Sequence, residues 1–231
     1  MPRKLNDVVY ILRPDIESTE LVYSLRSIEK NFPHKRVWFV GGQPKNLKPD
    51  IALPHKQQGI DKWDRIRSSM WAVVNDERLT DDFYLFNDDF FVMKPVKGKF
   101  VNFADRTLTQ RYDELASKHN WPYPYERTLY KAREELKSLG KGEVNFEVHL
   151  PMLMNRQLVI SSIYKCSSPQ MRSIYGNYNE IEYIQRDDVK VYDLETVPED
   201  ADYISTNDET FKGKVGEYIR SCFTEPSRFE V

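Results

Sequence analysis

The sequence predicts an α/β protein in which helices flank a mostly parallel β-sheet and one helical insertion interrupts the pattern. Strand-like and helix-like segments alternate from residue 7 to residue 86, as in parallel sheets with crossover helices. The alternation breaks at residues 97–142, which are polar, contain prolines and are only partly helical in pattern. With 231 residues, the chain suits a single domain with a sizeable core.

The first strand, helix and second strand are expected within residues 7–42. DVVYIL (7–12) is rich in β-branched and aromatic residues, which favours a buried strand. Residues 18–33 then change to helical spacing, with Leu21 and Leu25 on one face. KRVWFVGG (35–42) is predicted to be the second strand, ending at paired glycines.

A further helix and strand complete the alternating part. Residues 60–79 have the spacing of an amphipathic helix, with Ile66, Met70 and Val73 on the apolar side. FYLF (83–86) is the next predicted strand, and it ends directly before an acidic pair.

The insertion at 97–142 is expected to form a lid or an acceptor-binding subdomain, with its exit at LGKGE (139–143). Beyond it, residues 149–164 are predicted to be helical and DVKVYDL (188–194) to be a strand. The tail 213–231 is predicted to form one more amphipathic helix before a proline-stopped end.

Composition narrows the protein classes to be considered. No stretch approaches the ~20 apolar residues of a spanning helix, and the first residues lack signal-peptide features, so a cytoplasmic protein without a membrane span is expected. Cys166 and Cys222 lie far apart without metal-type spacing, which argues against a disulfide framework or zinc cluster. The net charge of −2 gives no overall basic field for nucleic acid.

The acidic pair Asp88 and Asp89 follows the strand at 83–86 after one residue, Asn87. Ligands of open α/β sheets bind beyond the carboxyl ends of the strands, and paired carboxylates there suit Mg²⁺ or Mn²⁺ bridging to phosphates. The alternative is an acidic turn in which these side chains cap backbone amides. Apolar runs on both sides of the pair favour the metal site, because a surface turn does not require them.

His149 is the candidate general base, since an imidazole ahead of a predicted helix start at Pro151 can accept a proton from an attacking hydroxyl. STND (205–208) is a further candidate. Its default role is to form a cap or a turn before the last helix, whereas Asp208 would otherwise approach the metal or substrate hydroxyls. The other histidines are assigned structural or solvent-exposed roles: His34, His55 and His119.

Four separated blocks resemble the signature regions of the Stealth family, which comprises capsular-polysaccharide phosphotransferases and the animal N-acetylglucosamine-1-phosphotransferase. In chain order the blocks are DVVYIL (7–12), YSLRSIEKNFP through FYLFNDDFFVMKPV (23–96), VHLPMLMNR (148–156) and YISTNDETF through FTEPSRFE (203–230). Their order matches, and together they bracket nearly the whole chain.

The resemblance implies a type-A glycosyltransferase-like scaffold and a function. Members move a sugar-1-phosphate from a nucleotide-diphosphate sugar, such as a UDP-sugar, to an acceptor hydroxyl. By resemblance, Asp88 and Asp89 would hold the metal and diphosphate, and His149 would lie at the catalytic centre with Asp89 and Asp208. The expected donor-binding residues are Arg13, Asn87, Arg156 and Asn207.

Two departures from the family pattern affect substrate identity. The first block continues as ILRPDIE where the family has a tryptophan and an acidic-glycine turn, so Arg13 or Asp15 would replace those contacts. The segment before the acidic pair also lacks the family's small, asparagine-rich stretch. Arg13, Arg156 or Arg172 could clamp phosphate through a bidentate fork, and the alternative for any one of them is an arginine on the solvated surface.

The sequence is also compatible with two other functions. A true glycosyltransferase would use the same donor and metal but attack the anomeric carbon. A carbohydrate- or nucleotide-binding module would bind without turnover. The acceptor could be a polysaccharide, a glycan precursor, a protein or a modified nucleic-acid base; basic residues in 97–142 offer a local patch for nucleic acid, but acidic residues there offset them.

Overall fold

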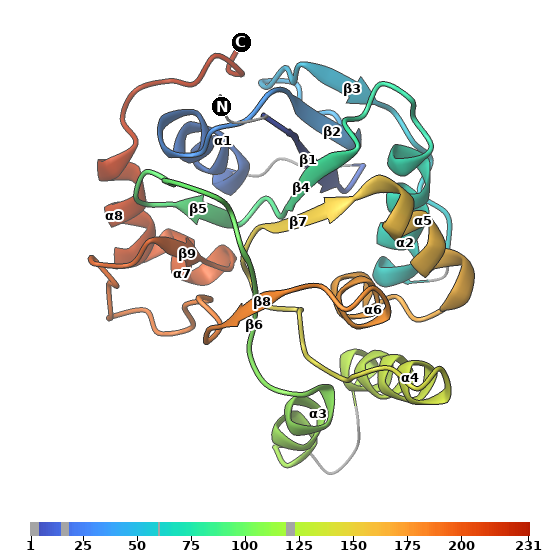
Figure 1. Ribbon diagram of the computed structural model, residues 1–231. Helices are drawn as coiled ribbons and strands as arrows, with labels where there is room; N and C mark the ends of the chain where they lie inside the picture. Colours follow the sequence, from blue (N-terminus) through green and yellow to red (C-terminus); the bar gives the residue numbers. More distant parts are fainter. Residues whose placement is uncertain (1–4, 15–18, 60, 119–122) are drawn as a thin grey trace.

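The computed structural model describes residues 5–14, 19–59, 61–118 and 123–231 (Figure 1). The strands are β1 (Asp7–Leu12), β2 (Val37–Gly41), β3 (Ile51–Leu53), β4 (Asp82–Phe86), β5 (Phe90–Val92), β6 (Asn102–Ala104), β7 (Met152–Asn155), β8 (Tyr183–Gln185) and β9 (Tyr203–Ser205). The helices are α1 (Thr19–Asn31), α2 (Lys62–Val74), α3 (Leu108–Ala116), α4 (Pro124–Ser138), α5 (Arg156–Lys165), α6 (Met171–Tyr178), α7 (Asp208–Lys212) and α8 (Lys214–Cys222).

The central sheet has five strands in the order β3-β2-β1-β4-β7. β1 pairs in parallel with β2 and β4, and β2 pairs in parallel with β3, whereas β7 runs antiparallel to β4. The predicted α/β class with a mainly parallel sheet flanked by helices is therefore confirmed, and it is compatible with a Rossmann-like fold. β3 was not predicted, because three residues are too few to give a clear pattern.

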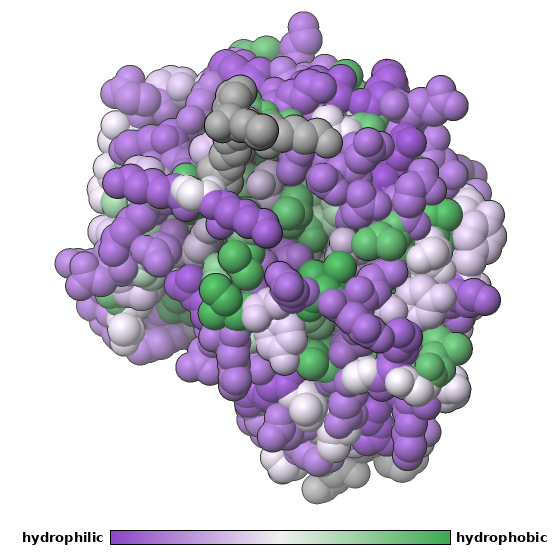
Figure 2. All heavy atoms as spheres, viewed as in Figure 1, coloured by the Kyte–Doolittle hydropathy of each residue, from purple (hydrophilic) through white to green (hydrophobic). Residues whose placement is uncertain are grey.

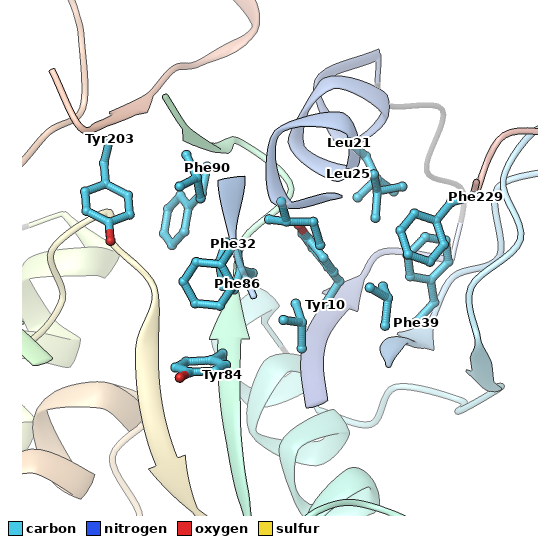
Figure 3. Packing of buried hydrophobic residues seen from close by; sticks show 14 of the residues in the cluster. Tyr10, Leu21, Leu25, Phe32, Phe39, Tyr84, Phe86, Phe90, Tyr203 and Phe229 are labelled. Carbon is cyan, nitrogen blue, oxygen red and sulfur yellow. The ribbon is translucent and has the colours of Figure 1, made fainter. Parts of the chain in front are cut away.

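Alternate residues of the central strands pack on opposite faces of the sheet. Val8 and Tyr10 of β1 pack with Leu25 of α1 on one face, where Figure 3 shows aromatic rings filling the layer. Val9 of β1 packs with Met70 of α2 on the other face, which α5 and α6 also cover. Burial on both faces explains why these strands have continuous apolar runs.

A small antiparallel sheet of β5 and β9 continues from the end of β4. Phe91 of β5 packs with Phe211 of α7 and with Val215 and Ile219 of α8. This unit lies beside α1 in Figure 1. The helix predicted in the tail is confirmed as α8.

The range 97–142 contains strand β6 and the helices α3 and α4, which extend away from the central sheet (Figure 1). Leu108 and Leu136 of these helices pack against Ile174 of α6. β6 pairs in parallel with β8. Gly140, at the predicted exit, has a φ of 65°, a left-handed conformation that favours glycine after the last turn of α4.

Two predicted elements are wrong. Residues 149–164 are not one helix, because Met152 and Met154 alternate inward in β7 and the helix begins only at Arg156. Residues 188–194 do not form a strand; Lys190 makes an isolated bridge to Ser205. Ile66 was also expected on the apolar side of its helix, yet it is 38% exposed.

The helices and the two cysteines were both considered from composition. None of the helices in the described ranges combines the length and apolar character needed to cross a bilayer. Both cysteines are free thiols, and burial raises the pKa of Cys166 to about 11. A thiol with a raised pKa is a poor nucleophile at neutral pH.

Candidate active site

Polar side chains from separate parts of the chain meet at the carboxyl edge of the parallel strands. Arg13 follows β1, and Asn87, Asp88 and Asp89 follow β4. Because β7 is antiparallel to β4 and its first residue pairs with Leu85, the residues just before β7 lie at this same edge. His149 is therefore brought to the strand ends that carry the acidic pair.

The acidic pair lies in a tight turn between β4 and β5, closed by a hydrogen bond from the amide of Phe90 to the carbonyl of Asn87. The carboxylate of Asp89 does not cap this turn. Its Oδ2 accepts a hydrogen bond from Nζ of Lys190 at 2.8 Å, and its Oδ1 is buried without a hydrogen-bond partner among the described residues. A buried acceptor without a partner is costly, which makes it a candidate ligand atom.

Electrostatic crowding distinguishes this cluster. Burial and the charge of Asp89 raise the pKa of Asp88 to about 6. Burial, opposed by the hydrogen bond from Thr206, raises the pKa of Glu20 to about 7, and the charges of Asp89, Asp88 and Asp208 add to it. Closely spaced carboxylates favour a shared proton or a bound cation.

The oxygen atoms present fit a cation of Mg²⁺ or Mn²⁺ type. Such ions take oxygen ligands, bind through one or two carboxylates and keep several waters. Oδ1 of Asp89 and the carboxylate of Asp88 would provide the two protein contacts. No group of three His, Cys, Asp or Glu side chains surrounds a common point in the part of the chain that the structure describes. Waters and substrate phosphate oxygens would complete such a shell.

His149 is held by an aspartate that the sequence did not reveal. Its Nδ1 lies 2.7 Å from Oδ2 and 2.9 Å from Oδ1 of Asp188, so Nδ1–H donates and Nε2 is left with its lone pair. The backbone amide of His149 donates to the same carboxylate. Burial would raise the pKa of Asp188, but the hydrogen bond from His149 and the positive charge of that ring when it is protonated lower the pKa, which keeps the carboxylate ionised.

Residues 188–190 connect the histidine to the acidic pair. Asp188 binds His149, and two residues later Lys190 binds Asp89. The segment is anchored because the amide of Val191 donates to the carbonyl of Ser205 in β9. The ring of Phe90, the residue after Asp89, lies 6.2 Å from the His149 ring in an edge-to-face arrangement.

Asn207 and Asp208 lie next to this cluster. The amide of Thr206 donates to the carbonyl of Asp89, which brings the following residues to the site. Oδ1 of Asn207 caps α7 by accepting from the amides of Glu209 and Thr210, as the default interpretation predicted. The Asp208 side chain is exposed at the start of α7, and its charge reaches Glu20.

Two arginines expected to contact phosphate are placed elsewhere, and a third expected residue, Asp15, is not described. Arg156 follows the end of β7, so it lies at the amino edge of β4, where it donates to the carbonyl of Asp76. It is remote from Asp88, and its assignment as a donor-binding residue is not supported by this geometry. Arg172 is buried and donates to the carbonyl of Leu150 and to Oδ1 of Asn87, so it supports the turn rather than presenting a phosphate fork. Asp15 lies outside the described residues.

An aromatic pair connects α2 to α4. Trp63 of α2 and Tyr125 of α4 stack with their ring centroids 6.3 Å apart. Burial raises the pKa of Tyr125, and the charges of Glu147 and Asp188 add to it, so Tyr125 lies within electrostatic reach of the histidine's partner. Figure 2 shows apolar side chains gathered in the middle of this face, between the central sheet and the α3–α4 pair.

Several residues of the site could not be found from sequence patterns. Glu20 has the ordinary role of an acid in a first helical turn. Asp188 and Lys190 lie in a segment whose apolar residues favoured a strand. The one available signal was the Asp-Asp pair at 187–188, which resembles the pair at 88–89 only in composition, as the pair at 81–82 also does.

Comparison with known proteins gave no matching family model and no curated protein with significant similarity. The resemblance of the four blocks to the Stealth family therefore stays a prediction. The function has to be inferred from the side chains at the carboxyl edge.

Proposed function

We propose that this protein is a metal-dependent nucleotide-sugar transferase that moves a sugar-1-phosphate from a UDP-sugar-type donor to an acceptor hydroxyl. One observation carries the proposal: Asp89, beside Asp88 at the carboxyl edge, has a buried oxygen without a hydrogen-bond partner among the described residues. That edge is where ligands of open α/β sheets bind. The order of the four Stealth-like blocks and the mainly parallel α/β sheet, which is compatible with a Rossmann-like fold, support the proposal.

Asp88 and Asp89 would hold the Mg²⁺ or Mn²⁺ ion. When bound, the cation would supply positive charge to the diphosphate of the donor. Lys190, already paired with Asp89, adds a fixed positive charge at the same place. Arg13 is exposed after β1, and its charge lowers the pKa of Asp88 against the effect of burial, so it lies within reach of the same phosphates.

His149 would act as the general base. Asp188 fixes the Nδ1–H tautomer and stabilises the imidazolium that forms. Nε2 takes the proton of the acceptor hydroxyl while the acceptor oxygen forms a bond to the β-phosphorus. The bond from that phosphorus to the bridging oxygen breaks, and a nucleoside monophosphate leaves. The remaining contribution of the protein is positioning and charge, as in other phosphoryl transfers.

Hydrolysis of the donor tests the proposal without knowledge of the acceptor. Water in place of the acceptor would convert a nucleotide sugar into a sugar-1-phosphate and a nucleoside monophosphate. Attack of water at the anomeric carbon would instead release a free sugar and a nucleoside diphosphate. The protein should be incubated with a panel of nucleotide sugars and Mn²⁺, and the products separated by ion-exchange chromatography.

Metal-dependent release of a nucleoside monophosphate supports sugar-1-phosphate transfer. Release of a nucleoside diphosphate would contradict it and identify a true glycosyltransferase. Binding of a donor without turnover, also in the presence of candidate acceptors, would favour a binding module.

A further inference from the structure

A basic cavity of about 310 Å³ lies beside the proposed site, on the strands β6, β8 and β9. Its polar lining contains four cationic side chains and one carboxylate, and three aromatic rings lie beneath them. The lining side chains used below are Lys94, Lys97, Lys99, Arg186, Asp202 and the rings of Phe100, Phe103 and Tyr203.

Positive charge is concentrated at this cavity although the whole chain has a net charge of −2. Lys94 is engaged, since it donates to the carbonyl of Asp200 and lies 3.8 Å from the carboxylate of Asp202. Lys97 and Lys99 are exposed on either side of Gly98, whose φ of 75° forms the turn. Neither lysine has a carboxylate partner among the described residues.

The Arg186 guanidinium is held by two aromatic rings and has no carboxylate partner among the described residues. Its guanidinium lies 5.4 Å from the ring centroids of both Phe103 and Tyr203. No carboxylate or carbonyl in the described ranges accepts a hydrogen bond from the guanidinium, whereas the backbone amide of Arg186 donates to the carbonyl of Ala104. Cation–π contact fixes the plane of a guanidinium while its N–H groups stay available, which suits recognition of a carboxylate or phosphate.

The shape of the cavity favours a compact ligand. Phe100 and Tyr203 are only 6% and 8% exposed, so their rings form a floor and present little free face. Binding of a nucleic-acid strand uses successive exposed rings on which bases stack. A single anionic group on a saccharide ring fits this concave, basic surface better.

The cavity adjoins the catalytic centre along one segment. Arg186 lies two residues before Asp188, the partner of His149, and two residues of chain span at most about 7 Å. Lys190 then reaches Asp89. A ligand in the cavity and a hydroxyl at His149 could therefore belong to one molecule.

We propose that this basic cavity is an acceptor subsite that binds a phosphate or carboxylate group carried by a saccharide. The assignment rests on the proposed transferase function, because it places the reacting hydroxyl of the same acceptor at His149. The enzyme would thus select an anionic glycan over a neutral one.

Nuclear magnetic resonance titration of the whole chain tests this proposal. Mannose 6-phosphate, glucuronate, mannose, inorganic phosphate and a single-stranded oligonucleotide would be added separately to isotopically labelled protein. Either charged sugar should shift the amides of 97–103 and 184–186, whereas mannose should not. Inorganic phosphate should bind more weakly than the sugar phosphate.

Charge variants give the matched comparison. Lys97→Gln with Lys99→Gln should weaken charged-sugar binding about tenfold, since two exposed cations are removed without loss of packing. Lys45→Gln with Lys48→Gln, an exposed lysine pair between β2 and β3, should leave it unchanged.

Four results would overturn the subsite: no shift at the cavity with either charged sugar, equal binding by the Lys97/Lys99 variant, equal binding of inorganic phosphate, or tighter binding of the oligonucleotide. Metal-dependent donor binding should persist in the Lys97/Lys99 variant. Loss of charged-sugar binding with donor binding intact would overturn the subsite and leave the transferase proposal standing. Charged-sugar binding without any donor binding would overturn the transferase proposal and with it the acceptor role, leaving an anion-binding cavity.

Discussion

Asp88 and Asp89 follow each other in the chain but lie in different electrostatic surroundings. Asp89 has a cationic partner in Lys190, whereas the pKa of Asp88 is raised to about 6 by burial and by the charge of Asp89. A carboxylate kept under such repulsion is unfavourable for folding and favourable for binding a cation. A residue that is destabilised by burial and by a neighbouring like charge is typical of functional sites.

Asp88→Asn should raise the free energy of unfolding at pH 8. The folded pKa of Asp88 exceeds its unfolded value, so the folded state binds more protons between about pH 4 and pH 6 and loses stability as pH rises through that window. The expected gain is on the order of 1–3 kcal/mol at pH 8 and vanishes near pH 4. Urea unfolding at both pH values measures it.

The control for this prediction is Asp81→Asn, an exposed aspartate at the opposite end of β4, which should change stability little at either pH. Equal stability of Asp88→Asn and the wild-type protein at pH 8 would contradict the electrostatic account of Asp88.

Replacing the histidine or its partner should reduce turnover without loss of donor binding. His149→Gln should lower the rate of donor hydrolysis about 10²- to 10⁴-fold, because a general base is removed. Asp188→Asn should have an effect of similar order, since an amide no longer fixes the Nδ1–H tautomer. Rates and donor affinity would be measured separately.

Asp187→Asn, at the exposed neighbouring position, serves as the control and should keep turnover within about twofold. Wild-type turnover in Asp188→Asn would show that His149 does not need this carboxylate to act as the base.

At the residue scale, local patterns were sufficient for some site residues and not for others. Asn87, Asp88 and Asp89 could be selected because they directly follow an apolar strand. Asp188 and Lys190 contact residues 39 and 101 positions away, and no local pattern encodes such contacts. Arg156 was expected near the donor because the direction of the neighbouring strand was unknown, and the structure places it at the amino edge of β4.

At the scale of the elements, the start of α7 explains the role of Asn207 in STND (205–208). Asn207 caps this short helix through Oδ1. It lies near Asp89 because the backbone amide of the preceding residue, Thr206, donates to the carbonyl of Asp89. Asn207→Asp keeps the capping oxygen and removes the amide group, whereas Asn207→Ala removes both.

Asn207→Ala should lower the free energy of unfolding by about 1 kcal/mol, and Asn207→Asp should leave it nearly unchanged. If Asn207 also contacts the donor, Asn207→Asp should weaken donor affinity at wild-type stability. Thermal unfolding and donor titration separate the two roles, and wild-type affinity in Asn207→Asp would remove Asn207 from the donor site.

The junction of α7 and α8 depends on a close approach of backbone. A Cβ atom at Gly216 would lie far inside contact distance of the carbonyl oxygen of Phe211. Gly216→Ala should therefore destabilise the protein by several kcal/mol, by a mechanism comparable to overpacking of a core. Glu217→Ala, exposed on the same helix, should cost less than about 0.5 kcal/mol. Equal stability of the two variants in urea unfolding would contradict this packing.

Element type was harder to predict after residue 142 than before it. The first strands are buried on both faces and give continuous apolar runs, which identify them. Met152–Asn155 is short and joins directly to α5, so its alternation merges with the helical pattern. β8 is exposed at all three residues and gives no apolar signal.

At the scale of the whole molecule, alternation of strands and helices was enough to predict a mainly parallel α/β sheet. Strand order and the antiparallel direction of β7 were not predictable, because they depend on contacts between distant segments. That direction matters for function, since it brings His149 to the edge that holds the acidic pair and takes Arg156 away from it.

The central claim is that Asp88 and Asp89 hold a divalent cation that is needed to bind a nucleotide sugar. Thermal unfolding of the wild-type protein and of Asp89→Asn, with each nucleotide sugar and with or without Mn²⁺, tests it most directly. One donor should stabilise the wild-type protein only with Mn²⁺, by about 2.7 kcal/mol at one hundred times the dissociation constant, and should leave Asp89→Asn unchanged. Equal stabilisation of Asp89→Asn, or no stabilisation by any nucleotide sugar, would contradict the claim.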